Sequence, residues 1–164
     1  MMARLAGFKF AAFCCCFLAL AACSKKNTPD LEAGGPGVGQ ARPGSQQDFT
    51  VNVGDRIYFA EDQTTLSADA QGTLQRQGQW LKQYPRVTIQ VEGHADERGT
   101  REYNISLSAR RATATREFLI AQGVNGKRIS SIAYGKERPV ALCDAEQCWS
   151  QNRRAVTVIT GGAN

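Results

Sequence analysis

From about residue 49 onward, the apolar positions of this chain follow the periods of strands and helices. Val87, Ile89 and Val91 alternate with polar residues, which predicts a strand with one buried face. Other segments predict strands at 55–59, 129–134 and 155–160, and helices between Ser67 and Pro85, at 104–122 and at 144–152. Because strands alternate with helices, we expect an α/β fold, a two-layer sandwich with helices packed on one face of a small mixed β-sheet.

The helix predicted at 104–122 separates two adjacent arginines. At about 100° per residue, one stripe holds Asn104, Leu107, Ser108, Arg111, Ala112, Thr115, Phe118 and Leu119. The apolar end of this stripe faces the core, so Arg111 points inward, whereas Arg110 points into solvent. A buried guanidinium must be paired or must face a cleft. The pattern leaves open whether Arg111 forms a structural ion pair with an acid such as Asp96 or belongs to a ligand site.

The turn before this helix supplies chemistry that could complement Arg111. The strand at 87–92 ends at Gly93, so His94 and Asp96 follow its carboxyl end, where ligands of open α/β sheets collect. Asp96 can accept hydrogen bonds from an ammonium group, and Arg111 can hold a carboxylate with its planar fork. Together they could grip both ends of a zwitterion. This is a binding chemistry, and it needs no catalyst.

No constellation in the sequence indicates an enzyme. His94 is the single histidine and has no apparent second histidine or cysteine partner. We interpret it as a packing or hydrogen-bonding residue, and we expect no catalytic residue, no cofactor and no metal. The net charge is +5, with positive and negative residues interspersed, and no basic run exceeds two residues. This pattern argues against nucleic acid as a partner.

The N-terminal 22 residues have the features of a secretory signal peptide. A positively charged start precedes an apolar run at 10–20, which is too short to span a bilayer. Small residues then lead to Cys23 in an arrangement that resembles the bacterial lipobox, in which the cysteine is lipidated and becomes the N-terminus. Ser24 follows it, which by the same resemblance implies sorting to the outer membrane. The alternative is a soluble secreted protein whose cysteine stands there by chance.

The remaining N-terminal part predicts a tether. Residues 23–48 are rich in glycine and proline and have no hydrophobic period, which predicts a flexible linker before a folded domain at 49–164. The lipobox resemblance implies that a lipid on Cys23 anchors this linker. Of the six cysteines, only Cys143 and Cys148 lie in that domain. In an oxidising compartment the pair favours a local disulfide over a metal site, because zinc requires four ligands and His94 is far away in sequence.

Several motifs together resemble a known family. The helix carries Asn-x-x-Leu-Ser-x-x-Arg-Ala at 104–112, and the turn before it reads GHADERGT at 93–100. Further matching segments are YGKE at 134–137 and NRRAV at 152–156. The domain resembles the OmpA-like C-terminal domain family, in the version typical of lipoproteins that associate with peptidoglycan in Gram-negative bacteria.

The resemblance implies a ligand and a set of site residues. Asp96 would meet the ammonium and Arg111 the carboxylate of the diaminopimelate in the peptidoglycan stem peptide. The residues expected to border this pocket are His94, Asn104, Leu107 and Asp62. The chain departs from the family pattern at Ala60, where an acidic residue is common, so the edge of the pocket near Asp62 is expected to differ.

The resemblance also implies partners and a location. We expect an outer-membrane lipoprotein with its domain in the periplasm, bound to peptidoglycan, to TolB and to other Tol proteins. The Tol-Pal system draws the outer membrane inward at cell division. Two alternatives are a TolB-binding scaffold with little affinity for the wall, and a cell-wall hydrolase.

Overall fold

The computed structural model describes residues 41–164. The predicted signal peptide, the lipidation site Cys23 and most of the predicted linker lie outside the described residues. Within the described part of the chain, no helix is both long and apolar enough to cross a membrane.

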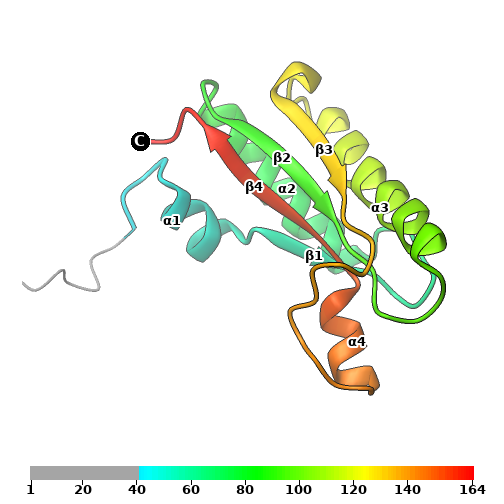
Figure 1. The fold of residues 1–164 in the computed structure, drawn as a ribbon. Helices are drawn as coiled ribbons and strands as arrows, with labels where there is room; N and C mark the ends of the chain where they lie inside the picture. The colour runs from blue at the N-terminus through cyan, green and yellow to red at the C-terminus, as the bar shows by residue number, and fades with distance from the viewer. Residues whose placement is uncertain (1–40) are drawn as a thin grey trace, which may run out of the picture. The chain divides into compact units, whose positions relative to one another are not determined.

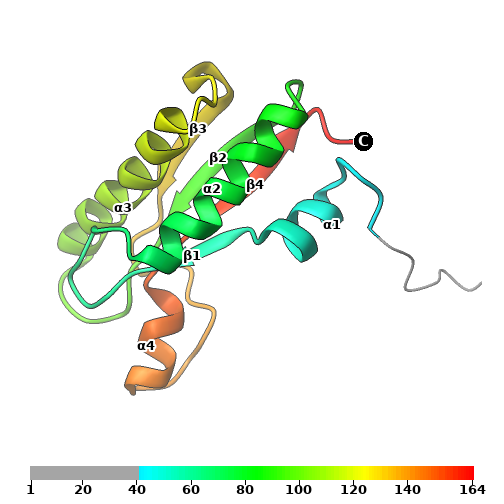
Figure 2. The same ribbon diagram turned by 180° about the vertical axis from the view of Figure 1, so that it is seen from behind.

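The domain is an α/β sandwich of two layers, as the sequence predicts. A four-stranded mixed sheet has the strand order β1-β4-β2-β3, and helices α2 and α3 cover one of its faces (Figures 1 and 2). The main elements are β1 (Arg56–Tyr58), α2 (Ala68–Gln83), β2 (Thr88–Gly93), α3 (Arg101–Ala121), β3 (Ile129–Ala133), α4 (Glu146–Asn152) and β4 (Arg154–Gly161). The largest difference from the predicted bounds is the start of α3, at Arg101 rather than at Asn104.

The pairing of the strands brings several loops to one edge of the sheet. Strand β2 runs parallel to β3 and antiparallel to β4, and its last residue Gly93 pairs with Ala133 on one side and Ala155 on the other. Strand β1 is antiparallel to β4, and its last residue Tyr58 pairs with Arg154. The loops that leave β1, β2 and β3 therefore meet where β4 begins.

The helices form where the sequence supplies caps and apolar faces. The Oγ of Ser67 accepts from the backbone N of Ala70 at 3.2 Å, which caps α2. Leu74 and Leu81 of α2 are fully buried against the sheet. Burial of such a leucine side chain stabilises the fold by about 2 kcal/mol.

Helix α3 lies directly on the end of β2. A Cβ atom built on Gly93 would lie 1.9 Å from the backbone oxygen of Ser108, so only glycine permits this close approach. The helix begins early because the Oγ1 of Thr100 accepts from the backbone N of Tyr103 at 3.2 Å. The result is a rigid junction between the strand end, the turn after it and the first turns of α3.

The folded domain begins before residue 49, which corrects the predicted boundary. Residues Gln46–Asp48 form a short helix, α1, and a π-helical turn follows it at Phe49–Val53. The indole Nε1 of Trp80 donates to the Oδ2 of Asp48 at 2.8 Å. The sequence pattern did not reveal this, because the anchoring contact joins residues that are far apart in the chain.

Candidate functional site

A cleft opens at the edge of the sheet where β1 and β2 end. It lies between the loop after β1 and the turn that joins β2 to α3, and its volume is about 240 Å³. The residues that line it are Glu61, Asp62, Asp96, Arg98, Gly99, Tyr103, Asn104, Leu107 and Arg111. The structure thus brings together all the predicted site residues except the His94 side chain.

Arg111 lies at the floor of this cleft, with 0% of the residue exposed. Its Nε donates to the backbone carbonyl of Gln63 at 2.9 Å, and its Nη2 donates to that of Ala60 at 3.1 Å. Its Nη1 donates to the carbonyl of His94 at 2.9 Å. Backbone oxygens, not a carboxylate, therefore hold the guanidinium, so Arg111 does not form the ion pair with Asp96 that the helical pattern left open.

The charge of Arg111 persists despite its burial. Burial lowers the pKa of Arg111 to about 10, and the negative charge of Asp96 acts in the opposite direction. The side chain therefore stays protonated at neutral pH. Its neighbour Arg110 is exposed and donates to the Oγ of Ser106 on the same helix at 2.8 Å. The predicted division between an inward and an outward arginine is confirmed.

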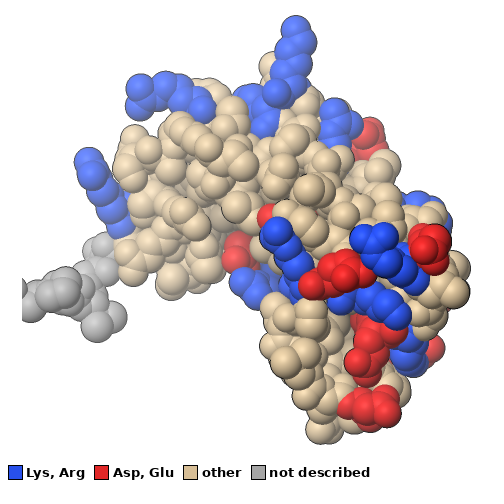
Figure 3. All heavy atoms as spheres, in the orientation of Figure 1, with Lys and Arg blue, Asp and Glu red and all other residues tan. Residues whose placement is uncertain are grey.

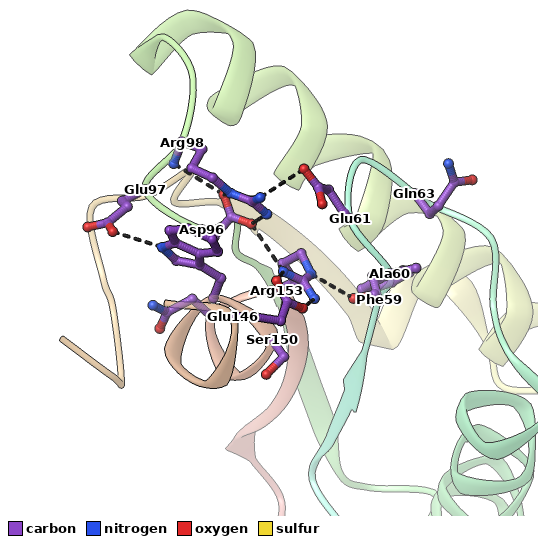
Figure 4. A network of polar contacts seen from close by, with 12 residues as sticks. Phe59, Ala60, Glu61, Gln63, Asp96, Glu97, Arg98, Glu146, Ser150 and Arg153 are labelled. Carbon is purple, nitrogen blue, oxygen red and sulfur yellow. Dashed lines mark hydrogen bonds and ion pairs between the residues drawn. The ribbon is translucent and has the colours of Figure 1, made fainter. Parts of the chain in front are cut away.

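Asp96 is 8% exposed, and its carboxylate accepts hydrogen bonds from two arginines. Its Oδ1 accepts from the backbone N of Arg98 at 3.2 Å and from the Nε of Arg98 at 3.3 Å. Its Oδ2 accepts from the Nη2 of Arg98 at 2.6 Å and from the Nη1 of Arg153 at 3.4 Å (Figure 4). Burial acts to raise the pKa of Asp96, but these donors outweigh it and hold the pKa below its usual range.

Arg153 is a member of the site that the sequence reading did not assign. It is buried, its Nε donates to the carbonyl of Phe59 at 3.1 Å, and its Nη2 pairs with the carboxylate of Glu146. It thereby joins the end of β1, the turn after β2 and the helix α4. The NRRAV segment signalled this arginine through family resemblance, but its partners lie far away in the chain.

Arg98 crosses the mouth of the cleft. Besides its contacts to Asp96, its Nη1 donates to the Oε1 of Glu61 in the loop after β1, at 2.8 Å (Figure 4). Its guanidinium carbon lies 4.2 Å from the ring centre of Trp149 in α4. The indole Nε1 of Trp149 donates to the Oε1 of Glu97 at 2.8 Å. Helix α4 therefore supports the turn between β2 and α3 from one side, and the loop after β1 contacts that turn from the other side.

The turn between β2 and α3 is held from two further directions. The Nδ2 of Asn104 donates to the carbonyl of Arg98 at 2.7 Å. The Nζ of Lys136 donates to the carbonyls of Glu97 at 3.0 Å and Gly99 at 2.8 Å. Asn104 thus lines the cleft and also fixes the backbone that carries Asp96. Preorganised backbone of this kind keeps the spacing of the charged groups constant.

The loop after β1 closes the other side of the cleft. Asp62 accepts a hydrogen bond from the hydroxyl of Tyr103 and has a positive φ of 52°. Ala60 contributes its backbone carbonyl to Arg111, while its side chain is exposed. The departure from the family pattern at Ala60 therefore leaves the contact to Arg111 in place.

The His94 side chain does not reach the cleft, which corrects its predicted place in the pocket. Its ring is 1% exposed and stacks on Tyr134 with ring centres 5.5 Å apart. Burial lowers the pKa of His94 to about 3, helped by the positive charges of Arg154, Arg138 and Arg56. Only its backbone takes part in the site. The ring instead lies beside Tyr134 and Glu92, with its Nε2 3.7 Å from the Oε2 of Glu92.

The two cysteines of the domain are bonded to each other. The Cys143–Cys148 disulfide joins residues with Cα atoms 5.6 Å apart and ties the loop before α4 to the third residue of that helix. The side chain of Asn152, at the end of α4, accepts from the backbone N of Val140 at 2.8 Å and of Ala141 at 3.2 Å. Helix α4 and its preceding loop thus form one fastened unit beside the cleft.

Acidic and basic side chains alternate around this edge of the domain. Figure 3 shows that, on the face in view, they gather near α4 and the start of α3, while much of the open sheet face is uncharged. The ion pairs here join Arg98 to Glu61 and Asp96, and Arg101 to Glu137. Mixed charge of this kind suits a small ligand that carries both signs.

The family of the chain follows from its likeness to known proteins. Residues 58–153 match the model of the OmpA family. The chain therefore belongs to the OmpA family.

Within that family, the chain is similar to proteins named peptidoglycan-associated lipoprotein. The one from Agrobacterium fabrum is 66% identical over 147 residues, which cover 88% of this chain and 83% of the relative. The one from Rhizobium meliloti is 64% identical over 149 residues, which cover 90% of this chain and 85% of the relative.

Solved structures show the same fold. The crystal structure of the peptidoglycan-associated lipoprotein from Burkholderia pseudomallei matches with a TM-score of 0.66 and 37% identity, covering 70% of this chain and 98% of that chain. The C-terminal domain of Helicobacter pylori MotB matches with a TM-score of 0.61 and 26% identity, covering 65% of this chain and 84% of that chain. The predicted OmpA-like α/β fold is therefore confirmed.

Proposed function

We propose that this protein binds peptidoglycan noncovalently through the diaminopimelate of the stem peptide. The observation that carries the proposal is the presence of Asp96 and Arg111 in one cleft, on the turn and the helix that follow β2. Diaminopimelate offers an ammonium and a carboxylate on one carbon atom. The relatives' name states an association with peptidoglycan, which supports that polymer as the partner.

In this proposal, Arg111 binds the carboxylate of the ligand and Asp96 binds its ammonium. Two of the acceptors of Arg111 are carbonyls of the loop after β1, at Ala60 and Gln63. A ligand carboxylate takes the place of one of these carbonyls after a small shift of the loop. An ionised acceptor forms a stronger hydrogen bond with a guanidinium than a neutral carbonyl does, which favours the exchange. The ammonium binds the carboxylate of Asp96.

The remaining lining residues shape the cleft around the rest of the ligand. Leu107 supplies an apolar wall for the methylene chain of diaminopimelate, and Asn104 holds the turn in register. Asp62 and Tyr103 close the side next to α3 through their hydrogen bond. The His94 ring lies outside the cleft, so its part is structural.

The proposal includes the wider setting implied by family resemblance. In this proposal the signal segment directs export, and a lipid on Cys23 anchors the protein in the outer membrane with the domain in the periplasm. There it anchors the membrane to the wall and works with TolB and other Tol proteins in the constriction of the outer membrane at cell division. The role is binding and not catalysis.

Sedimentation with purified peptidoglycan sacculi tests the binding site. Wild-type protein is expected to pellet with the sacculi, and Arg111→Lys to remain mostly in the supernatant. Lysine keeps the positive charge but loses the planar fork that holds a carboxylate at two points. Arg110→Lys is the matched control and is expected to pellet like the wild type.

Two measurements keep this test specific. Thermal unfolding of each variant shows whether Arg111→Lys remains folded at the temperature of sedimentation. Free meso-diaminopimelate, added in excess, is expected to release the wild-type protein from the sacculi. Full pelleting of a folded Arg111→Lys variant, or no release by diaminopimelate, contradicts the proposed site.

A further inference from the structure

We propose that Arg98 is an internal cation that occupies the ammonium position of the cleft, and that Trp149, held by the Cys143–Cys148 disulfide, sets how firmly Arg98 stays there. The inference rests on the proposed function, since it concerns the ligand that binds Asp96. It assigns a role in ligand selection to three features that the proposed function leaves unused: the bridging arginine, the tryptophan of α4 and the disulfide.

The first step is that Asp96 has no free acceptor position. A carboxylate offers about four lone-pair positions for hydrogen bonds. The backbone N, Nε and Nη2 of Arg98 and the Nη1 of Arg153 account for all of them. An incoming ammonium can therefore bind Asp96 only when one of these donors leaves.

The second step identifies the donor that leaves. The Arg98 side chain is 32% exposed, whereas the Arg153 side chain is 6% exposed. Arg153 is also fixed by the carbonyl of Phe59 and by Glu146. Arg98 reaches outward to the exposed carboxylate of Glu61, so its guanidinium can rotate toward solvent while keeping a partner. The guanidinium of Arg98 is therefore the displaceable cation.

The third step concerns what retains Arg98 at Asp96. The Trp149 ring lies against its guanidinium, at 4.2 Å from ring centre to guanidinium carbon. The hydrogen bond from the Nε1 of Trp149 to Glu97 fixes the orientation of that ring beside the turn. A cation held over an indole face is stabilised by the ring quadrupole, most strongly when partly desolvated. Trp149 thus favours the position in which the Arg98 guanidinium binds Asp96.

The fourth step links Trp149 to the disulfide. Cys148, the residue before Trp149, is bonded to Cys143 in the preceding loop. Asn152 fastens the same loop to the end of α4 through the backbone of Val140 and Ala141. A helix of only seven residues is marginal without such ties. Reduction of the disulfide therefore loosens Trp149 and, with it, the retention of Arg98.

The consequence is that Arg98 and the ligand's ammonium compete for the carboxylate of Asp96, while the ligand's other groups are unaffected. A ligand with a free amine at diaminopimelate must displace Arg98, and a ligand without that amine leaves Arg98 in place. Arg98 is accordingly a positioning and selectivity residue: it occupies the subsite that the ligand's amine requires. Its removal should strengthen binding only for ligands that carry the free amine.

Isothermal titration calorimetry with two peptides tests this. The first is a stem tripeptide ending in meso-diaminopimelate, with its alanine acetylated; the second is also acetylated on the free diaminopimelate amine. Arg98→Ala is expected to bind the first peptide about tenfold more tightly than the wild type does, the value of one charge-assisted hydrogen bond. It is expected to bind the second peptide no more tightly than the wild type does.

The control variant is Arg101→Ala. Arg101 also lies near the start of α3 and is paired with an acid, Glu137, but it does not line the cleft. Its removal is expected to change the affinity for either peptide by no more than about twofold, as for an exposed ion pair. This control separates the local competition at Asp96 from a general loss of positive charge.

Two further arms test the part played by α4. Trp149→Leu is expected to tighten binding of the free-amine peptide by about threefold, the effect of losing one partly exposed cation–π contact. Reduction of the wild-type protein is expected to shift affinity in the same direction, and reduction of Arg98→Ala is expected to change nothing. Thermal unfolding confirms that each form is folded at the titration temperature.

The outcomes separate this inference from the proposed function. If wild type and every variant fail to bind both peptides, the proposed function is wrong. If the wild type binds the free-amine peptide and Arg98→Ala binds it equally or more weakly, the proposed function stands and the role of Arg98 as a competing cation is refuted. Equal gains for both peptides would also overturn it, because selectivity for the amine is the property it predicts.

Discussion

The Nη1 of Arg111 lies 2.9 Å from the carbonyl oxygen of His94, so a side chain of α3 is tied to the backbone just beyond the end of β2. The same guanidinium holds the loop after β1 through Ala60 and Gln63. One residue thus joins three segments of the cleft. Its role is therefore structural before any ligand binds.

Arg111→Ala is expected to lower the free energy of unfolding by about 3 kcal/mol, because it leaves buried carbonyl oxygens without donors. Urea unfolding followed by circular dichroism measures the change. Arg110→Ala, at the exposed neighbouring position, is expected to change stability by less than about 0.5 kcal/mol. Equal stabilities of the two variants would show that the carbonyl contacts of Arg111 contribute little.

Gly93→Ala is expected to destabilise the domain by about 3 kcal/mol or more, because the added methyl group collides with the backbone of α3. The clash is with the carbonyl of Ser108, which cannot move without shifting the helix. Gly72→Ala in α2 is the matched control. Its added Cβ meets only the end of the Arg76 side chain, at 3.9 Å.

The control should change stability in the opposite direction. Alanine replaces glycine in a helix interior with a gain of about 1 kcal/mol. Thermal or urea unfolding of both variants provides the comparison. A Gly93→Ala variant as stable as the wild type would mean that α3 can move away from β2 at little cost.

The buried ring of His94 predicts a pH dependence of stability. The pKa of His94 is lowered from 6.5 to about 3, first by burial and then by Arg154, Arg138 and Arg56. At a pH between these two pKa values, His94 is protonated in the unfolded chain and neutral in the folded chain. Proton uptake therefore favours unfolding, and stability falls as the pH drops from about 6.5 toward 3, by at most about 1.4 kcal/mol per pH unit.

Urea unfolding at pH values from 7 to 4.5 measures this slope. Carboxylates with lowered pKa values, such as Asp96, stabilise the fold above their unfolded pKa and lose that contribution only at lower pH. His94→Phe retains an aromatic ring against Tyr134 but cannot titrate. Its stability is expected to change less over this range than that of the wild type, and an identical slope would assign the effect to another group.

Asp48→Ala is expected to lower the free energy of unfolding by about 2 kcal/mol, the value of hydrogen bonds to a charged group. The carboxylate of Asp48 accepts from Trp80 at 2.8 Å and from the backbone N of Gly44 at 2.9 Å. Tryptophan fluorescence during urea unfolding reports the change. Asp144→Ala, in an exposed loop, serves as the control and should have little effect.

The periodicity of the sequence was sufficient to identify the helical face that carries the site. Asn104, Leu107 and Arg111 recur at helical spacing, so a regular helix places them together whatever packs against it. The turn with Asp96 could also be located, because the alternation of β2 ends at Gly93. Both inferences depend on neighbours in the chain.

The partners of these residues could not be read in the same way. Arg98 and Arg153 bind Asp96, but a pattern of apolar and polar positions does not say which arginine meets which acid. Glu61 and Trp149 come from segments far from the turn. They reach it only because the end of β1 and the start of β4 lie at the same edge of the sheet as the end of β2. The His94 ring was expected in the pocket, but it packs on Tyr134, a residue 40 positions further along the chain.

The sequence by itself determined the α/β class, the inward phase of Arg111 and the position of Asp96 in the turn after β2, because these follow from local periodicity. Only the tertiary structure decided that backbone carbonyls hold Arg111 and that two arginines occupy the acceptor positions of the Asp96 carboxylate. It also decided that α4 lies beside the cleft. Those outcomes depend on the order of strands in the sheet, which brings distant residues within hydrogen-bonding distance. Hydrogen bonds act over a few ångströms in space, and separation along the chain does not limit them.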